Sequence, residues 1–292
     1  MKIVKNIVFF ILGLFLVFNI VFVTLGLFVH FKLYNYNYYI SKFNSCDYYH
    51  AISMKSITKL SSLSSTTNIP KEAFKAYSDE TWIKSQVNNY TKHLIQYVTF
   101  KKESPYNIDF RMPGLKFDKS MNKYLESNNM LLDKNISDEI STVKRESEEV
   151  IDDSINIFDL KGIVAYEDFQ VVRKSLGFIY SNIFVYCSGL GLLLILILIY
   201  YRKVFYNILL WYGYSFVAAG ALIFFFSFTP YFINFSRIMS LMEDEHIRVL
   251  ITSIIDGFDK YFIEAGVIIV VLGLSLIWIS SKKTINYNLK IG

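Results

Sequence analysis

Long apolar runs, separated by polar stretches, organise this chain. The runs are Ile7–Val29, Phe178–Tyr200, Tyr206–Phe228 and Ile263–Ile279. A helix of about 17–25 apolar residues is long enough to cross the hydrocarbon core of a bilayer. Each run reaches that length, so the pattern predicts four membrane-spanning helices.

The first run is predicted to be a permanent span and not a cleaved signal peptide. Lys2 and Lys5 precede it, as basic residues precede both kinds of segment. Its 23 apolar residues exceed the core of a signal peptide, and the bulky sequence Phe28–Phe31 offers no cleavage site. Residues 1–30 are therefore read as the first span with a short cytoplasmic N-terminus.

The polar stretch that follows, residues 31–175, is predicted to be a helical domain inserted between the first two spans. Apolar residues recur in it at intervals of three and four, which marks one face of a helix. One such stripe is Ile83, Val87, Tyr90, Leu94 and Tyr97, and a second is Ile136, Ile140, Val143, Val150, Ile151, Ile155 and Phe158. Ser78 and Asn135 are the expected N-caps of these two helices.

Other parts of this domain carry weaker patterns. Residues 48–63 form a third helical candidate. The serine-rich segment 61–68 is predicted to be a connector, and 101–119, which contains Pro105, Pro113 and Gly114, is predicted to be a loop.

Residues 176–232 are predicted to be a hairpin of the second and third spans, with a cytoplasmic turn at 201–205. Residues 233–262 then form an amphipathic helical loop, in which Ser240 and Glu243 have the spacing of a capping box. The fourth span covers 263–281, and a tail of residues 282–292 ends the chain.

The distribution of charge predicts the orientation of the spans. The segments assigned to the cytoplasm carry seven basic residues and no acidic ones: Lys2, Lys5, Arg202, Lys203, Lys282, Lys283 and Lys290. The loop at 233–260 carries three basic and five acidic residues. Because basic residues accumulate in short cytoplasmic segments, both termini are expected in the cytoplasm and the helical domain outside it. The fold class expected is all-α, a four-helix membrane bundle with an all-α extracytoplasmic domain.

Small residues at an interval of seven predict how the spans pack. Gly213 and Gly220 have this spacing in the third span, and Gly266 and Gly273 have it in the fourth. Small residues let helices in lipid approach closely, and a period of seven favours a left-handed bundle. Asn19 with Gly26 in the first span, and Asn182 with Gly189 in the second, repeat the pattern.

Composition narrows the possible partners. The chain has 292 residues, of which 53% are hydrophobic. The inserted domain has 20 Lys and Arg against 19 Asp and Glu, so it offers no strong field for nucleic acid. The two cysteines, Cys46 and Cys187, fall in different environments and predict no disulfide. The partners expected are the lipid bilayer and either another membrane protein or a second copy of the chain.

Candidates for chemistry are few. Glu243 and His246 are weak candidates for a metal site, although carboxylates in the first turn of a helix also suit its dipole. Ser56 and Lys59 match a Ser-x-x-Lys motif that lacks its usual companions. Asn19 and Glu264 are the polar candidates within the spans. No catalytic residue and no cofactor is predicted.

The chain resembles uncharacterised membrane proteins of low-GC Gram-positive bacteria. The resemblance rests on the order of Tyr38-Tyr39-Ile40, Cys46-Asp47-Tyr48-Tyr49, Ile69-Pro70 and the segment Trp82–Tyr97. In those proteins a first span precedes an extracytoplasmic helical domain, and three spans follow. The resemblance implies a bacterial cell membrane and supplies no catalytic residues.

These observations favour a non-catalytic role as an accessory, scaffold or sensor that presents a helical domain at the cell exterior. Two alternatives remain open at this point. One is a component of a transport or channel complex, and the other is a hydrolase at the outer membrane face with a dispersed acidic site.

Overall fold

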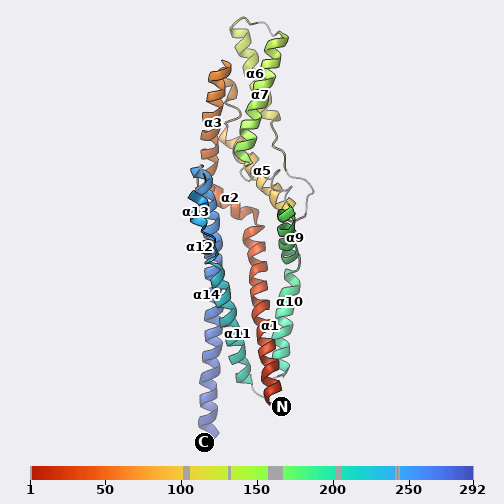
Figure 1. The fold of residues 1–292 in the computed structure, drawn as a ribbon, viewed down its shortest axis with the longest axis vertical. Coiled ribbons are helices and arrows are strands. Elements are labelled where there is room, and N and C mark those ends of the chain that lie inside the picture. Colours follow the sequence, from red (N-terminus) through yellow and green to blue (C-terminus); the bar gives the residue numbers. More distant parts are fainter. Residues whose placement is uncertain are drawn as a thin grey trace. The chain divides into compact units, whose positions relative to one another are not determined.

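The computed structural model of the chain describes residues 2–100, 106–130, 133–156, 167–200, 205–240, 242 and 244–291 (Figure 1). Within these ranges the chain is helical and contains no strand. The helices are α1 (Lys2–Phe28), the π-helical turn η1 (Val29–Leu33), α2 (Tyr36–Ser45), α3 (Tyr48–Thr67), α4 (Lys71–Phe74), α5 (Glu80–Val98), α6 (Arg111–Ser127), α7 (Lys134–Ile155), α9 (Glu167–Ser181), α10 (Ile183–Tyr200), α11 (Phe205–Phe226), α12 (Thr229–Phe232), α13 (Phe235–Ser240) and α14 (Glu245–Ile291). The all-α prediction is confirmed.

The chain folds as two compact units. The first, here called the apolar unit, comprises residues 1–35, 175–243 and 251–292. The second, here called the polar unit, comprises residues 36–174 and 244–250. Helices α9 and α14 each contribute residues to both units.

The apolar unit contains the candidate membrane spans. Three helical stretches are long and apolar enough to cross a bilayer: Phe10–Leu33, Ile208–Phe226 and Glu245–Lys282. Helices α9 and α10 together form one more candidate span, although they are bent by 51° at the break between them. The chain is therefore a multi-pass membrane protein with three or four spanning helices.

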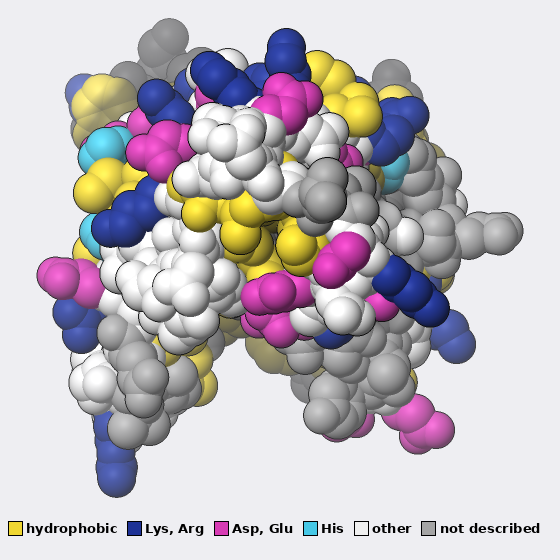
Figure 2. Space-filling view, turned by 90° about the horizontal axis from the view of Figure 1, so that it is seen from above, with side chains coloured by type: hydrophobic (Ala, Val, Ile, Leu, Met, Phe, Trp, Pro, Cys, Tyr) yellow, Lys and Arg dark blue, Asp and Glu magenta, His cyan; other side chains and the backbone are white. Residues whose placement is uncertain are grey.

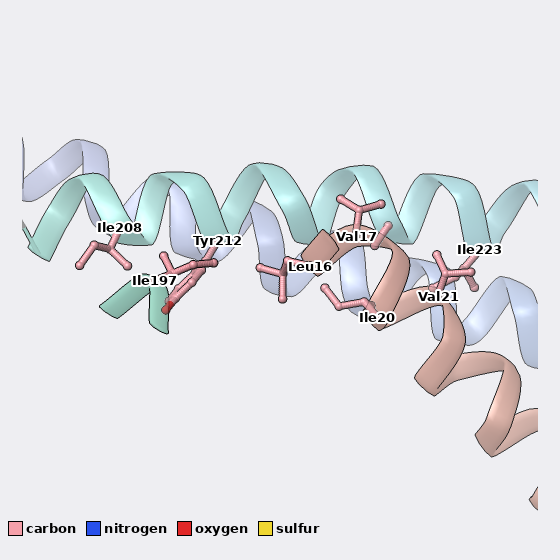
Figure 3. Close-up of a cluster of buried hydrophobic side chains, with 9 residues drawn as sticks. Leu16, Val17, Ile20, Val21, Ile197, Ile208, Tyr212 and Ile223 are labelled. Atoms are coloured by element: carbon pink, nitrogen blue, oxygen red, sulfur yellow. The ribbon is translucent and has the colours of Figure 1, made fainter. Parts of the chain in front are cut away.

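The helices of the apolar unit share one core of aliphatic side chains. Figure 3 shows this cluster, which α1, α10 and α11 supply. Its buried members are Leu16, Val17, Ile20, Val21, Ile197, Ile208, Tyr212, Ala219 and Ile223. Large apolar side chains also cover the outside of these helices, and Phe184 is 85% exposed. A helix that is apolar all round needs an apolar solvent, so this outer surface fits lipid.

The polar unit has a separate core. Helix α3 packs against α5 and α7, and α4 packs against α6. Fully buried side chains at these contacts include Tyr77, Phe117, Ile83 and Ile151. Both predicted apolar stripes face inward: Ile83, Val87, Tyr90 and Tyr97 are buried on α5, and Val143, Ile151 and Ile155 are buried on α7. Phe158 lies outside the described residues.

Two predicted irregular segments are helical instead. The serine-rich stretch continues α3 to Thr67, and its hydroxyls bond to carbonyls one turn earlier in the helix, as Ser65 Oγ does to Ser61 O at 2.9 Å. The predicted loop at 101–119 contains the start of α6 at Arg111. Pro113 falls in the first turn of α6, where an amide N–H has no partner within the helix and proline is tolerated.

The predicted helix starts are displaced by one to a few residues. Asp79, and not Ser78, caps α5 by accepting from Trp82 N at 2.9 Å. Asp133, and not Asn135, caps α7. Ser, Asn and Asp are comparable caps, so the position of the cap follows from where the packed part of each helix begins.

The segments around the later spans also differ from prediction. Leu176, the predicted start of the second span, lies inside α9, which begins at Glu167, and the helix breaks at Asn182. Helix α14 runs without a break from Glu245 to Ile291, so neither 262 nor 281 marks a helix boundary. Ser240 closes α13 by donating to Arg237 O at 2.8 Å, and Glu243, its predicted capping-box partner, lies outside the described residues. The basic turn at 201–204 lies outside the described residues.

Candidate functional site

The four glycines predicted to pack spans together lie at the contact of α11 and α14. A Cβ atom added to Gly220 would lie 2.8 Å from Gly266 O and 2.9 Å from Val270 N. One added to Gly213 would lie 2.8 Å from Gly273 O. These distances leave no room for a side chain, so the two helices touch backbone to backbone.

The corresponding small residues of the first two spans also face each other. A Cβ atom on Gly26 would overlap Ile183 Cδ1, and one on Gly189 would lie 3.2 Å from Asn19 Nδ2. The structure thus brings the Asn19 amide against α10. The Asn19 Oδ1 atom is buried and has no hydrogen-bond partner among the described residues.

The second polar candidate of the spans has a different environment. Glu264 lies on the exposed side of α14, and its Oε1 is 3.8 Å from Lys260 Nζ, one turn earlier. The interactions between described residues do not join Glu264 to Asn19. The two residues therefore do not form one polar pathway in this structure.

A charged contact of the polar unit involves the start of α14. Asp244 is the residue before this helix, and its Oδ1 accepts from the backbone N–H of His246 at 3.1 Å and of Ile247 at 3.4 Å. Its other oxygen, Oδ2, accepts a short hydrogen bond from Lys55 Nζ on α3. One carboxylate therefore caps α14 and fixes its first turn to α3. We call this contact the Lys55–Asp244 clasp.

The electrostatics of the clasp keep Asp244 charged. Partial burial acts to raise the pKa of Asp244, but the hydrogen bond and charge of Lys55 and the two backbone amides outweigh it and hold the pKa below its usual value. Nearby, burial raises the pKa of Tyr48 well above its usual value, and the charge of Asp244 adds to this. The Tyr48 hydroxyl is buried without a hydrogen-bond partner among the described residues.

Only one of the two residues of the clasp could have been predicted from the sequence. A cap at Asp244 is detectable, because an acidic residue precedes the apolar face that begins at Ile247. Its partner Lys55 is 189 residues away in the chain. Nothing local to either residue indicates that they meet.

The acidic residues considered for metal binding do not assemble into a site in the described part of the chain. Glu243 lies outside the described residues, and the His246 ring is exposed. No group of three or more His, Cys, Asp or Glu side chains within the described ranges could hold a metal ion. On α7, Glu149 pairs with Arg145 at 2.7 Å.

A partly buried set of polar contacts joins α7 to its neighbours. The Tyr77 hydroxyl donates to Glu148 Oε1 at 3.3 Å, and Lys144 Nζ donates to Asp118 Oδ2 at 2.6 Å. Burial raises the pKa of Glu148. These bonds fix α6, through Asp118, and the segment between α4 and α5, through Tyr77, against α7.

The Ser-x-x-Lys match has no catalytic geometry. Ser56 is fully buried, and its hydroxyl has no hydrogen-bond partner among the described residues. Lys59 lies exposed on the same helix. A nucleophile needs its base within hydrogen-bond reach, which this pair does not provide.

The polar unit carries two open hollows. The larger, of about 490 Å³, lies between the first turns of α5 and α6. Its lining residues are Ala76, Asp79, Thr81, Trp82, Ser85, Met112, Pro113 and Lys116. The smaller, of about 310 Å³, lies between α3 and α4. The sequence analysis missed the larger hollow, because three of its eight lining residues, Met112, Pro113 and Lys116, come from the segment predicted to be a loop.

Charge on the surface is mixed. In Figure 2, basic and acidic side chains alternate around the view, and apolar side chains show near its middle. This agrees with the near balance of 20 basic and 19 acidic residues in the stretch 31–174. Comparison of the chain with protein-family models, with curated proteins and with solved structures found no match.

Proposed function

We propose that the chain is a four-span protein of the bacterial cell membrane with both termini in the cytoplasm. In this arrangement the polar unit is an extracytoplasmic domain inserted between the first and second spans. The charge bias of the short segments supports the orientation, with seven basic and no acidic residues on the proposed inner side. The bent pair α9 and α10 would supply the second span, which brings the number of spans to four. The resemblance to membrane proteins of low-GC Gram-positive bacteria supports the same location.

Within that arrangement the proposed function is non-catalytic: an accessory, scaffold or sensor that presents its helical domain outside the membrane. The observation that carries this proposal is the Lys55–Asp244 clasp. Asp244 fixes the first turn of α14 to α3, and α14 continues unbroken as the proposed last span. A partner that displaces α3 would therefore act on the helix that continues as the proposed last span. A domain attached only by flexible linkers could not act in this way.

The proposal is tested by capture of a partner from native membranes. The tagged chain is cross-linked in cells, extracted in mild detergent, and purified beside a Lys55→Gln variant and a Lys59→Gln control on the exposed side of the same helix. A defined partner should be recovered at constant stoichiometry with the wild type and the control. A chain that remains solitary under all conditions would contradict an accessory or scaffold role.

A second candidate, a component of a transport or channel complex, is favoured by two irregular helices of the apolar unit. Helices α9 and α10 bend by 51° at Asn182, and η1 is a π-helical turn that carries His30. The His30 ring stacks on Tyr180, with ring centres 5.5 Å apart. Broken helices and π-turns often occur at functional sites of transporters. Capture of a transporter subunit in the same experiment would select this candidate.

A further inference from the structure

Helix α6 has an exposed face that combines apolar and basic side chains. Its buried face consists of Pro113, Gly114, Phe117, Met121 and Leu125. The opposite face carries Met112, Leu115, Lys116, Lys119 and Lys123, which are all exposed. At 100° per residue these five lie within an arc of about 100°. We call them the α6 face.

The apolar part of this face is unusually open. Met112 is 61% exposed and Leu115 is 64% exposed, and they lie one turn apart. A side chain in the interior of a domain would bury most of its area, because removal of apolar surface from water is favourable. The two side chains are therefore available to a partner.

The basic part of the face has more positive than negative charge, since three lysines share this side of α6 with one carboxylate. Within the described residues, none of the three lysines has an ion pair or a hydrogen bond. The neighbouring carboxylates are engaged elsewhere, Asp118 with Lys144 and Asp109 with Arg111. Glu126, at the end of the helix, is the acidic residue of α6 that shares this side. The α6 face is therefore a local positive row on a unit that is nearly neutral as a whole.

The larger hollow of the polar unit opens at the N-terminal end of the same face. Met112 and Lys116 belong to both the hollow and the α6 face. Trp82 and Pro113 add apolar wall, and the Trp82 ring is packed against Phe110 with ring centres 5.8 Å apart. The volume of about 490 Å³ lies in the range of ligand pockets, about 300–1,000 Å³. The apolar wall of the hollow therefore adjoins the row of lysines on α6.

We propose that the α6 face and this hollow bind an acidic polypeptide segment of a partner protein. A bulky apolar side chain of the segment enters the hollow beside Trp82 and Met112. Carboxylates three to four residues apart on the same segment lie over Lys116, Lys119 and Lys123, whose spacing they match. The inference rests on the proposed accessory function, because it identifies the kind of partner that the helical domain receives.

The chemistry favours a polypeptide over other polyanions. A nucleic acid or an anionic polysaccharide would use the lysines but has no apolar side chain for the hollow. An anionic membrane surface would attract the lysines, but lipid binding by a helix needs a broad apolar face. The α6 face offers only Met112 and Leu115 for that purpose. An acidic segment with one apolar anchor uses both features.

The test measures peptide binding to the purified full chain in nanodiscs of neutral lipid. The probe is a fluorescent peptide with one Phe followed by Glu at intervals of three and four. Two control peptides are used: one replaces Phe with Ser, and the other replaces every Glu with Gln. Polyglutamate and anionic-lipid vesicles serve as comparison ligands.

The protein variants are Met112→Ser and the double variant Lys116→Glu with Lys119→Glu. The matched controls on other exposed surfaces are Met54→Ser and the double variant Lys59→Glu with Lys92→Glu.

The acidic Phe peptide should bind the wild type, and binding should weaken as salt rises. The α6 double variant should weaken binding about tenfold or more, since it turns attraction into repulsion. Met112→Ser should lower the affinity for the Phe peptide severalfold and should leave the affinity for the Ser peptide unchanged. Both controls should bind like the wild type. Unchanged thermal midpoints will show that these surface variants fold.

Three results would overturn the inference. The first is no binding of the acidic Phe peptide. The second is equal binding of polyglutamate or anionic vesicles, which would show a general polyanion surface. The third is an equal loss in the control variants. The outcome is separable from the proposed function: a partner captured in cells by the wild type and equally by the α6 double variant would leave the accessory role intact and reject this docking site.

Discussion

Asp244 performs two tasks with one side chain. One carboxylate oxygen satisfies amides at the start of α14, and the other accepts from Lys55 on α3. Because the two contacts share one charge, a change in the protonation of Asp244 weakens both at once.

The pH dependence of this residue gives a first prediction. The pKa of Asp244 lies below its usual value of 3.8 in the folded chain. Folding therefore favours the ionised form, and the stabilisation is complete above about pH 4 and is lost as the pH falls below that value. Asp244→Asn should start α14 nearly as well, because Asn is a good cap, but it should lose the bond to Lys55.

The measurement is hydrogen exchange of residues 245–258 in detergent between pH 3 and pH 7. Exchange is corrected for the intrinsic effect of pH. The wild type should lose protection in this segment as the pH falls, whereas Asp244→Asn should be less protected at neutral pH and nearly insensitive to pH. Asp153→Asn, on an exposed position of α7, is the control. Equal profiles for the wild type and Asp244→Asn would show that the clasp does not hold α14.

Individual caps were the least predictable feature at this scale. Ser78 and Asn135 have the right chemistry, but Asp79 and Asp133 take the caps of α5 and α7. Polar residues able to cap a helix cluster before both helices. The choice among them depends on where the first buried turn begins, which the packing of the domain decides.

At the scale of elements, the period of seven in the glycines determines how α11 and α14 pack. Gly213 meets Gly273 and Gly220 meets Gly266, so the sequence order of the glycines on one helix is reversed on the other. This is the pairing of antiparallel helices. The period could be read from the sequence because each glycine removes a side chain from the same face of its own helix.

Replacement of one of these glycines gives a second prediction. Gly220→Ala places a methyl group 2.8 Å from Gly266 O, so the helices must separate. The expected loss is about 1–3 kcal/mol, the usual cost of overpacking. Gly191→Ala is the matched control in α10, since a Cβ there meets nothing within 4 Å. It should be neutral or slightly stabilising, because Ala favours helix over Gly by about 1 kcal/mol.

Both variants are compared with the wild type by unfolding in mixed micelles, followed by circular dichroism. An unfolding midpoint for Gly220→Ala equal to that of Gly191→Ala would show that the close contact of α11 and α14 does not contribute to stability.

Elements without such a period were harder to predict. Asn182 breaks the apolar segment 176–201, although its composition alone reads as continuous, because one polar residue does not change a hydropathy average.

At the scale of the whole molecule, the proposed topology predicts which residues a reagent outside the cell can reach. The native thiols are removed by Cys46→Ser and Cys187→Ser, and single cysteines are introduced as Asn128→Cys or Gly292→Cys. Asn128 follows α6 in the polar unit and is exposed. A membrane-impermeant maleimide should label Asn128→Cys in intact cells, and should label Gly292→Cys only after the membrane is opened.

The reverse pattern would place the polar unit in the cytoplasm and would contradict the proposed orientation. It would leave the fold unchanged, because the helical packing of each unit does not depend on the side of the membrane. The chemistry of the α6 face would also remain, although its partner would then be a cytoplasmic protein.

The sequence by itself determined the features that depend on local composition and period. Apolar runs of spanning length, stripes on α5 and α7, and the small-residue interval in the spans each follow from residues close together in the chain. These features give an all-helical membrane protein, and charge bias adds a proposed orientation. The same reading misplaced the start of α6, since Pro113 and Gly114 indicate a loop unless the first turn of a helix is known to fall there.

Only the tertiary structure decided which distant residues meet. Lys55 and Asp244 are separated by 189 positions, and the hollow beside the α6 face combines residues of two helices. Exposure of Met112 and Leu115 likewise depends on which face of α6 the core has covered. Such contacts arise because each helix buries its own apolar face, and the polar residues left outside are brought together by that burial and not by their own sequence.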